Sequence, residues 1–242
     1  MTITKNLSSD IQKKLNAVVI ELNAEFPHAE QMSRLARIIS DEVFDNTEEI
    51  ITNPDKKLLE WIEVEYQLFR AIEESKYGQK IRHGFKDMQE FLDIANSIMN
   101  RRKVRAGKSL EYQLSAIFDE NNLPYESQII TEANKKPDFI FPSGAAYHNL
   151  QYDADKLIIL AAKTTCKDRW RQILNEANRV RDKKKYLFTL QQNISSKQFL
   201  EMKSEGVVLI IPEPYRKNYP PSLRYEILNL AEFIDFVKDT IK

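Results

Sequence analysis

The second half of the chain changes from a helical to an alternating pattern, and this change constrains the fold more than any other feature. After about residue 120, short β-prone runs alternate with stretches of helical periodicity. The runs that we predict to be strands are Gln128–Thr131, Asp138–Phe141, Leu157–Ala162, Lys185–Leu190 and Val207–Ile211. The helices predicted among them are Lys167–Arg181, Ser195–Glu205 and Leu230–Ile241. This order indicates an α/β or α+β fold with a mixed central sheet flanked by helices.

The first part of the chain indicates helices only. The predicted helices begin at Ser9 or Asp10, at Glu30, near Asp55, at Met88 and at Ser109. Gly78 and Gly84 bracket the end of the third helix. The helix from Met88 and the helix from Ser109, which reaches Asn121, are expected to be separate.

Composition excludes several classes of protein. Only 5 glycines and 9 prolines exclude collagenous and low-complexity chains, and no apolar run is long enough to span a membrane. The single cysteine, Cys166, excludes an internal disulfide framework, and the polar start of the chain lacks the apolar core of a secretory signal. We therefore expect a soluble protein of the reducing cytoplasm.

Charge is balanced overall but unevenly distributed. The chain has 36 basic and 36 acidic side chains, of which 12 and 18 lie in residues 1–100, 17 and 11 in residues 101–190, and 7 and 7 in residues 191–242. A basic central segment is compatible with polyanion binding in one cleft, although such charge is more often a solvated face.

Asp138 and Lys163 are the first candidates for chemistry. Asp138 follows Pro137 and opens a predicted strand, and Lys163 ends the most apolar strand. Two adjacent strand ends would thus present a carboxylate and an amine. This pair suits phosphodiester hydrolysis, in which the carboxylate binds Mg²⁺ and the lysine orients water and offsets charge on the phosphate. Taken singly, Asp138 would be a turn aspartate and Lys163 a solvated strand end.

A second metal-binding acid is missing from its usual place in this PD-(D/E)xK arrangement. The residue two before Lys163 is Ala161, which cannot bind a metal. Glu176 on the following predicted helix is the best replacement, and α-helical spacing would put it on the same face as Arg169, seven residues earlier. The alternative for Glu176 alone is a surface carboxylate.

Three segments resemble the EcoRII-type restriction endonucleases of the PD-(D/E)xK superfamily. They are Asn100–Glu111 (NRRKVRAGKSLE), Asn134–Phe139 (NKKPDF) and Lys163–Glu176 (KTTCKDRWRQILNE). With weaker similarity in the flanks, the resemblance covers roughly residues 55–240. It implies a restriction-endonuclease-like fold in which Asp138, Lys163 and Glu176 form the catalytic core. It also implies that Glu111 is an additional acid and that Asp138, Glu176 and Glu111 bind Mg²⁺.

The resemblance also implies a DNA target. The segment Lys167-Asp168-Arg169 occupies the family position that reads the outer CC:GG pairs, and its side chains suit guanine and cytosine edges. The alternative to base reading is that this segment is only the start of a helix, with one acid and two exposed cations. The implied activity is that of a type II site-specific deoxyribonuclease, which cuts double-stranded DNA at a CC-(central base pair)-GG site and leaves 5′ overhangs. A homodimer would supply two identical half-site readers. The resemblance also implies a cognate DNA methyltransferase as the partner in a restriction-modification system, in which the two proteins need not contact each other.

Further DNA contacts are expected from the helical region. Asn100, Arg101, Arg102, Lys103 and Arg105 suit minor-groove and phosphate contacts, although some of these cations could instead pair with the acidic first third. The resemblance further implies that the central nucleotides are flipped out of the DNA helix, which requires a stacking platform, a side chain on which the flipped base can stack. The candidates for this platform are Trp61 with Lys57, and Tyr147 is a candidate for a phosphate contact. A core or dimer-interface role for Trp61 is equally compatible with the sequence.

The expected organisation follows from these assignments. We predict a helical region at residues 1–100 for dimerisation and DNA contacts, and a nuclease core at residues 101–242, within one compact structural unit. About fifty residues before the catalytic region are too few for the separate effector-binding domain of the family's namesake, so a stand-alone catalytic unit is expected. A structure-selective repair or recombination nuclease and a non-catalytic DNA-binding protein of the same fold are the alternatives.

Overall fold

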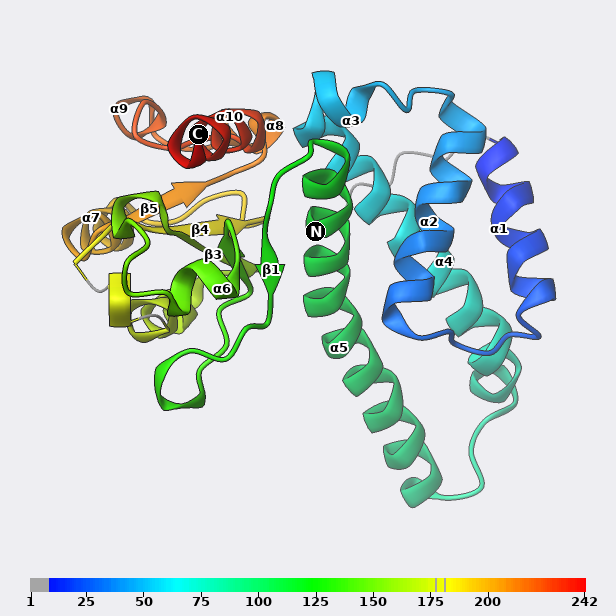
Figure 1. Cartoon of the computed structure of the whole chain (residues 1–242). Helices are drawn as coiled ribbons and strands as arrows, with labels where there is room; N and C mark the ends of the chain where they lie inside the picture. Colours follow the sequence, from blue (N-terminus) through cyan, green and yellow to red (C-terminus); the bar gives the residue numbers. More distant parts are fainter. Residues whose placement is uncertain (1–8, 177, 181) are drawn as a thin grey trace. The chain divides into compact units, whose positions relative to one another are not determined.

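A computed structural model of the chain divides into two compact units (Figure 1). It describes residues 9–176, 178–180 and 182–242, with the side chains of all of these except Ala133, Asp168, Arg169 and Asn178. The first unit contains the described residues up to Glu48 together with Leu58–Gln113, and the second contains Glu49–Lys57 and Leu114–Lys242. This boundary differs from the predicted division at residue 100, because residue 100 lies inside a continuous helix.

Helices form the first unit, as the sequence predicts. They are α1 (Ser9–Glu21), α2 (Ala29–Phe44), α4 (Pro54–His83) from Leu58 onward, and α5 (Met88–Glu120) as far as Gln113. Their apolar residues recur at helical spacing and pack into one core, which includes Ile11, Leu15, Met32, Ile39, Leu68 and Ile72.

The helix α5 corrects one expectation. The two helices predicted from Met88 and from Ser109 are a single helix of 33 residues, and the basic segment Asn100–Lys108 lies within it. Gly107 in its interior costs about 1 kcal/mol relative to alanine, which is too little to break a long helix. Gly84 ends α4 as predicted, with a φ of 87° that favours glycine. Although α4 and α5 are long, no helix among the described residues is apolar enough to cross a membrane.

A five-stranded mixed sheet lies at the centre of the second unit. The strands are β1 (Glu126–Ser127), β2 (Phe139–Phe141), β3 (Ile158–Lys163), β4 (Lys185–Thr189) and β5 (Val207–Ile210), and they lie side by side in chain order. β1, β2 and β3 are antiparallel to one another, whereas β3, β4 and β5 are parallel. The predicted fold class, a mixed central sheet with flanking helices and a helical N-terminal region, is confirmed.

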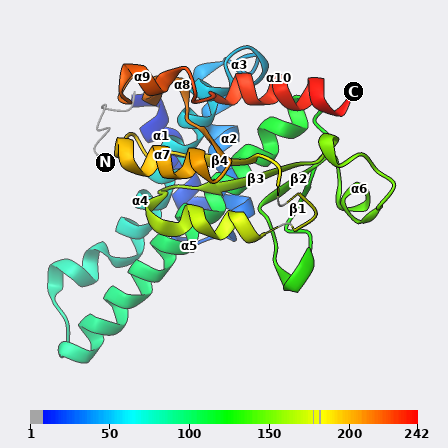
Figure 2. The same ribbon diagram turned by 90° about the vertical axis from the view of Figure 1, so that its left-hand side faces the viewer.

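Helices cover both faces of this sheet. Figures 1 and 2 show α10 on one face and the yellow segment that contains η3 on the other. The remaining elements of the unit are α3 (Glu49–Thr52), η1 (Glu132–Asn134), α6 (Gly144–His148), η2 (Ala154–Lys156), η3 (Lys167–Asn175), η4 (Asn178–Val180), α7 (Ser196–Ser204), α8 (Glu213–Arg216), α9 (Pro221–Arg224) and α10 (Leu230–Ile241). Phe118 packs edge-to-face on Phe139 and Phe141 at 5.3 and 5.4 Å between ring centroids, which fixes the end of α5 that belongs to this unit against the sheet.

Two predicted elements of the second unit are wrong. Gln128–Thr131 is not a strand, because Gln128 has a φ of 57° and the main-chain nitrogen of Thr131 donates to Lys135 instead of to a neighbouring strand. The helix predicted over Lys167–Arg181 is the 3₁₀ helix η3, followed by η4, with residues 177 and 181 outside the described part. A 3₁₀ helix has three residues per turn, so the set of residues that share a face differs from that of an α-helix.

Candidate active site

The structure brings Asp138 and Lys163 together at the ends of two adjacent strands. Asp138 directly precedes β2, Lys163 is the last residue of β3, and Phe139 lies opposite Leu160 in the antiparallel register. Oδ2 of Asp138 accepts hydrogen bonds from Nζ of Lys163 at 2.7 Å and from the main-chain nitrogen of Ala162 at 2.8 Å. The buried carboxylate therefore fixes the position of the half-buried ammonium group.

Glu176 reaches the same site because η3 has a period of three. Trp170, Ile173 and Glu176 align on one face, and Trp170 and Ile173 are buried. Burial raises the pKa of Glu176 to about 7; the positive charges of Lys163 and Lys135 oppose this rise, and the negative charge of Asp138 adds to it. These charges act on Glu176 because the side chains lie near one another.

The sequence did not indicate the residues that hold Glu176 in place. Oγ1 of Thr131 donates to the main-chain oxygen of Glu176, and it also lies 3.1 Å from the main-chain oxygen of Lys135. Nζ of Lys135 donates to the main-chain oxygen of Asn175 at 2.9 Å. Thr131 looked like a strand residue and Lys135 like part of a basic run. Only the tertiary structure shows that this loop supports the end of η3.

The carboxylates of Asp138 and Glu176 fit a hard divalent cation. Oε2 of Glu176 is buried and has no hydrogen-bond partner among the described residues, and Oδ1 of Asp138 has only a long contact of 3.4 Å from Nε2 of Gln128. Magnesium binds such carboxylate oxygens and retains several waters, so two protein ligands suffice. In the described part of the chain, no cluster of three or more His, Cys, Asp or Glu side chains could hold an ion.

Glu111 belongs to the first unit and is described there. Nζ of Lys108 donates to its Oε2 at 2.7 Å, one helical turn away on α5. Its role as an additional acid stays a prediction.

The predicted reading segment begins η3. Lys167 is exposed and has a φ of 34°, whereas the side chains of Asp168 and Arg169 lie outside what the structure describes. The expectation that Arg169 shares a face with Glu176 concerns one of these side chains and stays a prediction. Base reading by the triplet stays a prediction.

Intramolecular contacts engage three of the four cations of α5 that are predicted to contact DNA. Arg102 donates to both carboxylate oxygens of Glu73, at 2.9 and 2.5 Å. The guanidinium of Arg101 lies over Phe26 at 4.8 Å. Lys103, like Asn100, is exposed. The alternative that some of these cations pair with the first third of the chain therefore holds for Arg102.

Arg105, the remaining cation, is enclosed by aromatic rings. Its guanidinium lies 5.4 Å from the ring centre of Tyr66 and 5.3 Å from that of Phe69. Burial lowers the pKa of Arg105, and the negative charge of Glu65 opposes this effect. A contact from Arg105 to DNA phosphate would require it to leave these rings.

Burial corrects three of the predicted DNA contacts. Trp61 is 1% exposed and Lys57 is 0% exposed, so a flipped base could not stack on this indole. Trp61 is a core residue, the second of the two possibilities that its helical position allowed. Tyr147 is also buried, and its hydroxyl donates to Oε2 of Glu132 at 2.6 Å, which leaves it unavailable for phosphate.

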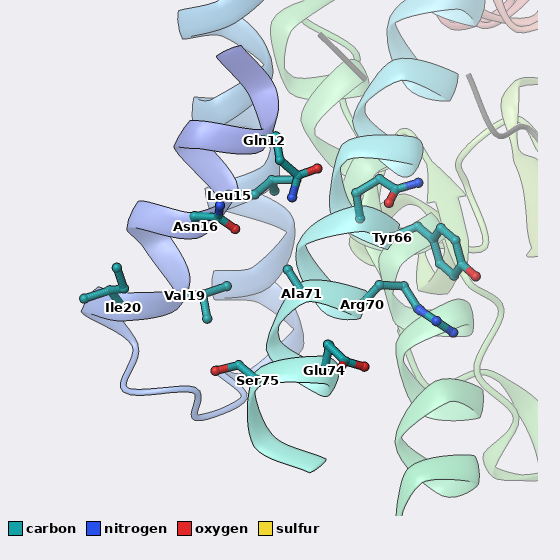
Figure 3. Close-up of a pocket in the computed structure, with 11 residues that line it drawn as sticks. Gln12, Leu15, Asn16, Val19, Ile20, Tyr66, Arg70, Ala71, Glu74 and Ser75 are labelled. Carbon is teal, nitrogen blue, oxygen red and sulfur yellow. The ribbon is translucent and has the colours of Figure 1, made fainter. Parts of the chain in front are cut away.

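The first unit contains a groove. It has a volume of about 830 Å³ between α1 and α4, and its lining includes Leu15, Val19, Tyr66 and Arg70 (Figure 3). None of the predicted catalytic residues lines it.

Comparison with known proteins gives one family. The family model described as EcoRII C terminal matches residues 69–234. The type II restriction enzyme EcoRII of Escherichia coli is 49% identical over 183 residues, which are 75% of this chain and 45% of that protein. The type II restriction enzyme SsoII of Shigella sonnei is 24% identical over 152 residues, which are 59% of this chain and 48% of that protein. This chain thus spans about half the length of the curated relatives that it matches.

Solved structures share the fold. Metal-depleted Ecl18kI in complex with uncleaved, modified DNA has a TM-score of 0.74 at 18% identity, over 97% of this chain and 84% of that chain. The complex of the restriction endonuclease PspGI with substrate DNA has a TM-score of 0.71 at 16% identity, over 98% of this chain and 99% of that chain. The family match spans Asp138, Lys163 and Glu176, and the chain belongs to the EcoRII C-terminal family.

Proposed function

We propose that this protein is a Mg²⁺-dependent type II restriction endonuclease, which hydrolyses phosphodiester bonds in both strands of double-stranded DNA at a specific sequence. The observation that carries the proposal is that Asp138 and Lys163 meet where β2 begins and β3 ends, beside Glu176, whose Oε2 has no hydrogen-bond partner among the described residues. Membership of the EcoRII C-terminal family adds to it. The buried free thiol of Cys166 accords with the reducing cytoplasm as the proposed location.

Each residue of the site has a chemical task in this proposal. Asp138 and Glu176 would hold the magnesium ion, which when bound supplies positive charge to the phosphate and to the attacking water. Lys163, kept in place by Asp138, orients that water and offsets the negative charge that develops on the phosphate oxygens. Glu176 must give up its proton before it can hold a cation, and its raised pKa makes this step depend on pH near neutrality.

The proposed target is a CC-(central base pair)-GG site that is cut to leave 5′ overhangs. Lys167-Asp168-Arg169 would read the outer pairs from the start of η3, and Glu176 lies at the C-terminal end of the same element. Reading and cutting groups on one short rigid element would couple recognition to cleavage. A homodimer would read both half-sites, and a cognate methyltransferase would protect the host sites. Flipping of central nucleotides remains part of the proposal, with a platform other than Trp61.

Plasmid digestion in Mg²⁺ tests the proposal against its two alternatives. A restriction endonuclease yields discrete fragments from a plasmid that contains CC–GG sites. A structure-selective nuclease cuts only branched substrates, and a non-catalytic DNA-binding protein cuts neither. The Asp138→Asn variant is the matched control, because it keeps the shape of the side chain and removes its charge. Fragments that form at the wild-type rate with this variant would remove Asp138 from the site.

A further inference from the structure

Two glutamine side chains from outside η3 hold the start of this helix. Oε1 of Gln191 accepts from the main-chain nitrogen of Cys166 at 2.8 Å, and Nε2 of Gln198 donates to the main-chain oxygen of Lys167 at 2.8 Å. The two carboxamides thus form hydrogen bonds with adjacent residues at the point where the predicted reading segment Lys167–Arg169 begins. We propose that Gln191 and Gln198 are positioning residues that set sequence discrimination. This inference rests on the proposed function.

The backbone at this point needs external support. Lys167 has a φ of 34°, in the left-handed region that is unfavourable for a residue with a Cβ. Cys166 before it is buried and right-handed, with a φ of −73° and a ψ of −55°. A strained turn of this kind persists only where its surroundings fix it, and the contacts to Gln191 and Gln198 lie on both sides of the turn.

Gln191 is itself rigidly held. Its main-chain nitrogen lies 3.2 Å from Oγ1 of Thr189, and its Nε2 donates to the main-chain oxygen of Asn193 at 2.8 Å. The hydroxyl of the buried Tyr219 donates to its main-chain oxygen at 2.6 Å. Thr189 lies opposite Lys163 in the parallel register of β3 and β4. The loop that holds Gln191 therefore begins at the same end of the sheet as Lys163.

Helix α7 supplies the second of these two hydrogen bonds, through Gln198. Gln198 lies in the first turn of α7, where its main-chain nitrogen lies 3.2 Å from the Oγ of the N-cap Ser195. Glu201, three residues further along α7, forms an ion pair with Arg171 of η3, whose guanidinium lies 4.7 Å from the centre of the Trp170 ring. Two side chains of α7 therefore hold the first half of η3.

The two ends of η3 are held independently. Thr131 and Lys135 hold its C-terminal end near Glu176, whereas Gln191 and Gln198 hold its start. Loss of the hydrogen bonds from Gln191 or Gln198 at the start of η3 should therefore move the reading side chains. Asp138, Lys163 and Glu176 should stay in place. The expected effect is relaxed discrimination between DNA sequences, with the hydrolysis itself preserved.

One isosteric substitution at two positions tests this geometry. Gln198→Glu removes the donor to Lys167 and places a carboxylate against a carbonyl oxygen. Gln191→Glu keeps an oxygen that can accept from Cys166, but it replaces the donor to the main-chain oxygen of Asn193 with a carboxylate. We expect Gln198→Glu to lower the ratio of kcat/KM on the cognate site to kcat/KM on a site with one changed outer pair by about tenfold, the loss of a well-placed hydrogen bond with added repulsion. Gln191→Glu should lower the same ratio by a similar factor, because repulsion from the main-chain oxygen of Asn193 displaces the side chain that accepts from Cys166.

Controls separate positioning from general destabilisation. Leu200→Ala changes an exposed residue of the same helix, 56% exposed, and should leave the ratio unchanged. Gln198→Arg keeps an N–H donor and should restore most of the discrimination. Hydrogen–deuterium exchange of the DNA-free protein should rise over residues 167–171 in Gln198→Glu and stay unchanged near residue 176.

The outcomes are distinct. A ratio that stays at the wild-type value in Gln198→Glu, or a proportional loss of activity on both sites, would overturn the positioning role. A wild-type protein that cuts without sequence preference would instead contradict the proposed function, and the exchange measurement would still report whether the two glutamines fix the start of η3.

Discussion

At the residue scale, the carboxyl group of Glu176 is the most informative feature of the site. Burial raises its pKa to about 7, its Oε2 atom has no hydrogen-bond partner in the described part of the chain, and the charges of Lys163 and Asp138 act on it. A carboxyl group in this state costs folding free energy when ionised, and a divalent cation would recover that cost. The stability of the protein, its pH dependence and its affinity for a metal ion should therefore all depend on this one side chain.

The stability of the protein should depend on pH through this group. Between about pH 4.5 and pH 7 the folded protein keeps a proton on Glu176 that the unfolded chain releases, so the free energy of unfolding falls as pH rises through this window. Glu176→Gln removes this component and should become more stable relative to the wild type across the window, by up to about 3 kcal/mol. Urea unfolding from pH 4.5 to pH 8 without divalent ions measures the difference. Parallel curves for the two proteins would contradict the assignment, and exposed Glu120 changed to glutamine is the control.

Removal of the Asp138 charge should separate binding from cleavage. Asp138→Asn keeps an oxygen for the main-chain nitrogen of Ala162 but loses the charge that holds both Lys163 and a cation. We expect cleavage to fall by roughly a hundredfold or more. Specific binding in Ca²⁺ should be retained, because less negative charge then faces the phosphate. A gel shift and a cleavage assay decide this, and near-normal cleavage would remove Asp138 from the site.

Base reading and phosphate contact should respond differently to mutation. Arg169→Ala should lose ~1–3 kcal/mol of discrimination, as expected for a bidentate contact with guanine. Exposed Lys103 on α5 should act evenly on all sequences, so Lys103→Ala should reduce the salt slope of binding by about 1. Binding titrations on cognate and random duplexes at several salt concentrations compare the two. Equal losses on both duplexes with Arg169→Ala would show that Arg169 does not read bases.

At the element scale, helix α4 shows what periodicity can and cannot decide. Leu58, Trp61, Leu68 and Ile72 recur at helical spacing and all are buried, so the sequence already contained the signal that Trp61 faces the core. Lys57, one helical turn earlier, is buried as well. The prediction of a stacking platform failed because spacing identifies a shared face but does not say what covers it.

Trp61 should therefore contribute to stability and not to base stacking. Trp61→Ala should lower the free energy of unfolding by about 3–5 kcal/mol, as for other large buried side chains, and Trp61→Phe should lower it by less. Urea unfolding measures both changes. A stable Trp61→Ala protein that has lost specific DNA binding would bring the stacking role back.

Element η3 marks the limit of prediction for the site. Its position after β3 followed from the sequence, but its 3₁₀ geometry did not, because helices of 3.0 and 3.6 residues per turn share nearly the same short-range pattern. Contacts with residues far along the chain, including Thr131, Gln191 and Gln198, hold this geometry. Local propensity contains no information on those contacts.

At the scale of the whole molecule, the sequence predicted the sheet well. Four of the five strands lie where apolar runs indicated them, because buried strands need continuous apolar residues such as Leu157–Ala162. β1 was placed a few residues too late, since Gln128 takes a positive φ that its residue type does not announce. The division into units also could not be predicted, because α5 belongs to both.

The proposed function of the whole molecule is to cut both strands of DNA at one kind of sequence. Digestion of a linear DNA library with a randomised segment in Mg²⁺, followed by sequencing of all new ends, measures this directly. We expect the ends to gather at CC-(central base pair)-GG sites, before the first C on each strand, with 5′ overhangs. Ends scattered over many sequences, or breaks confined to one strand, would contradict it.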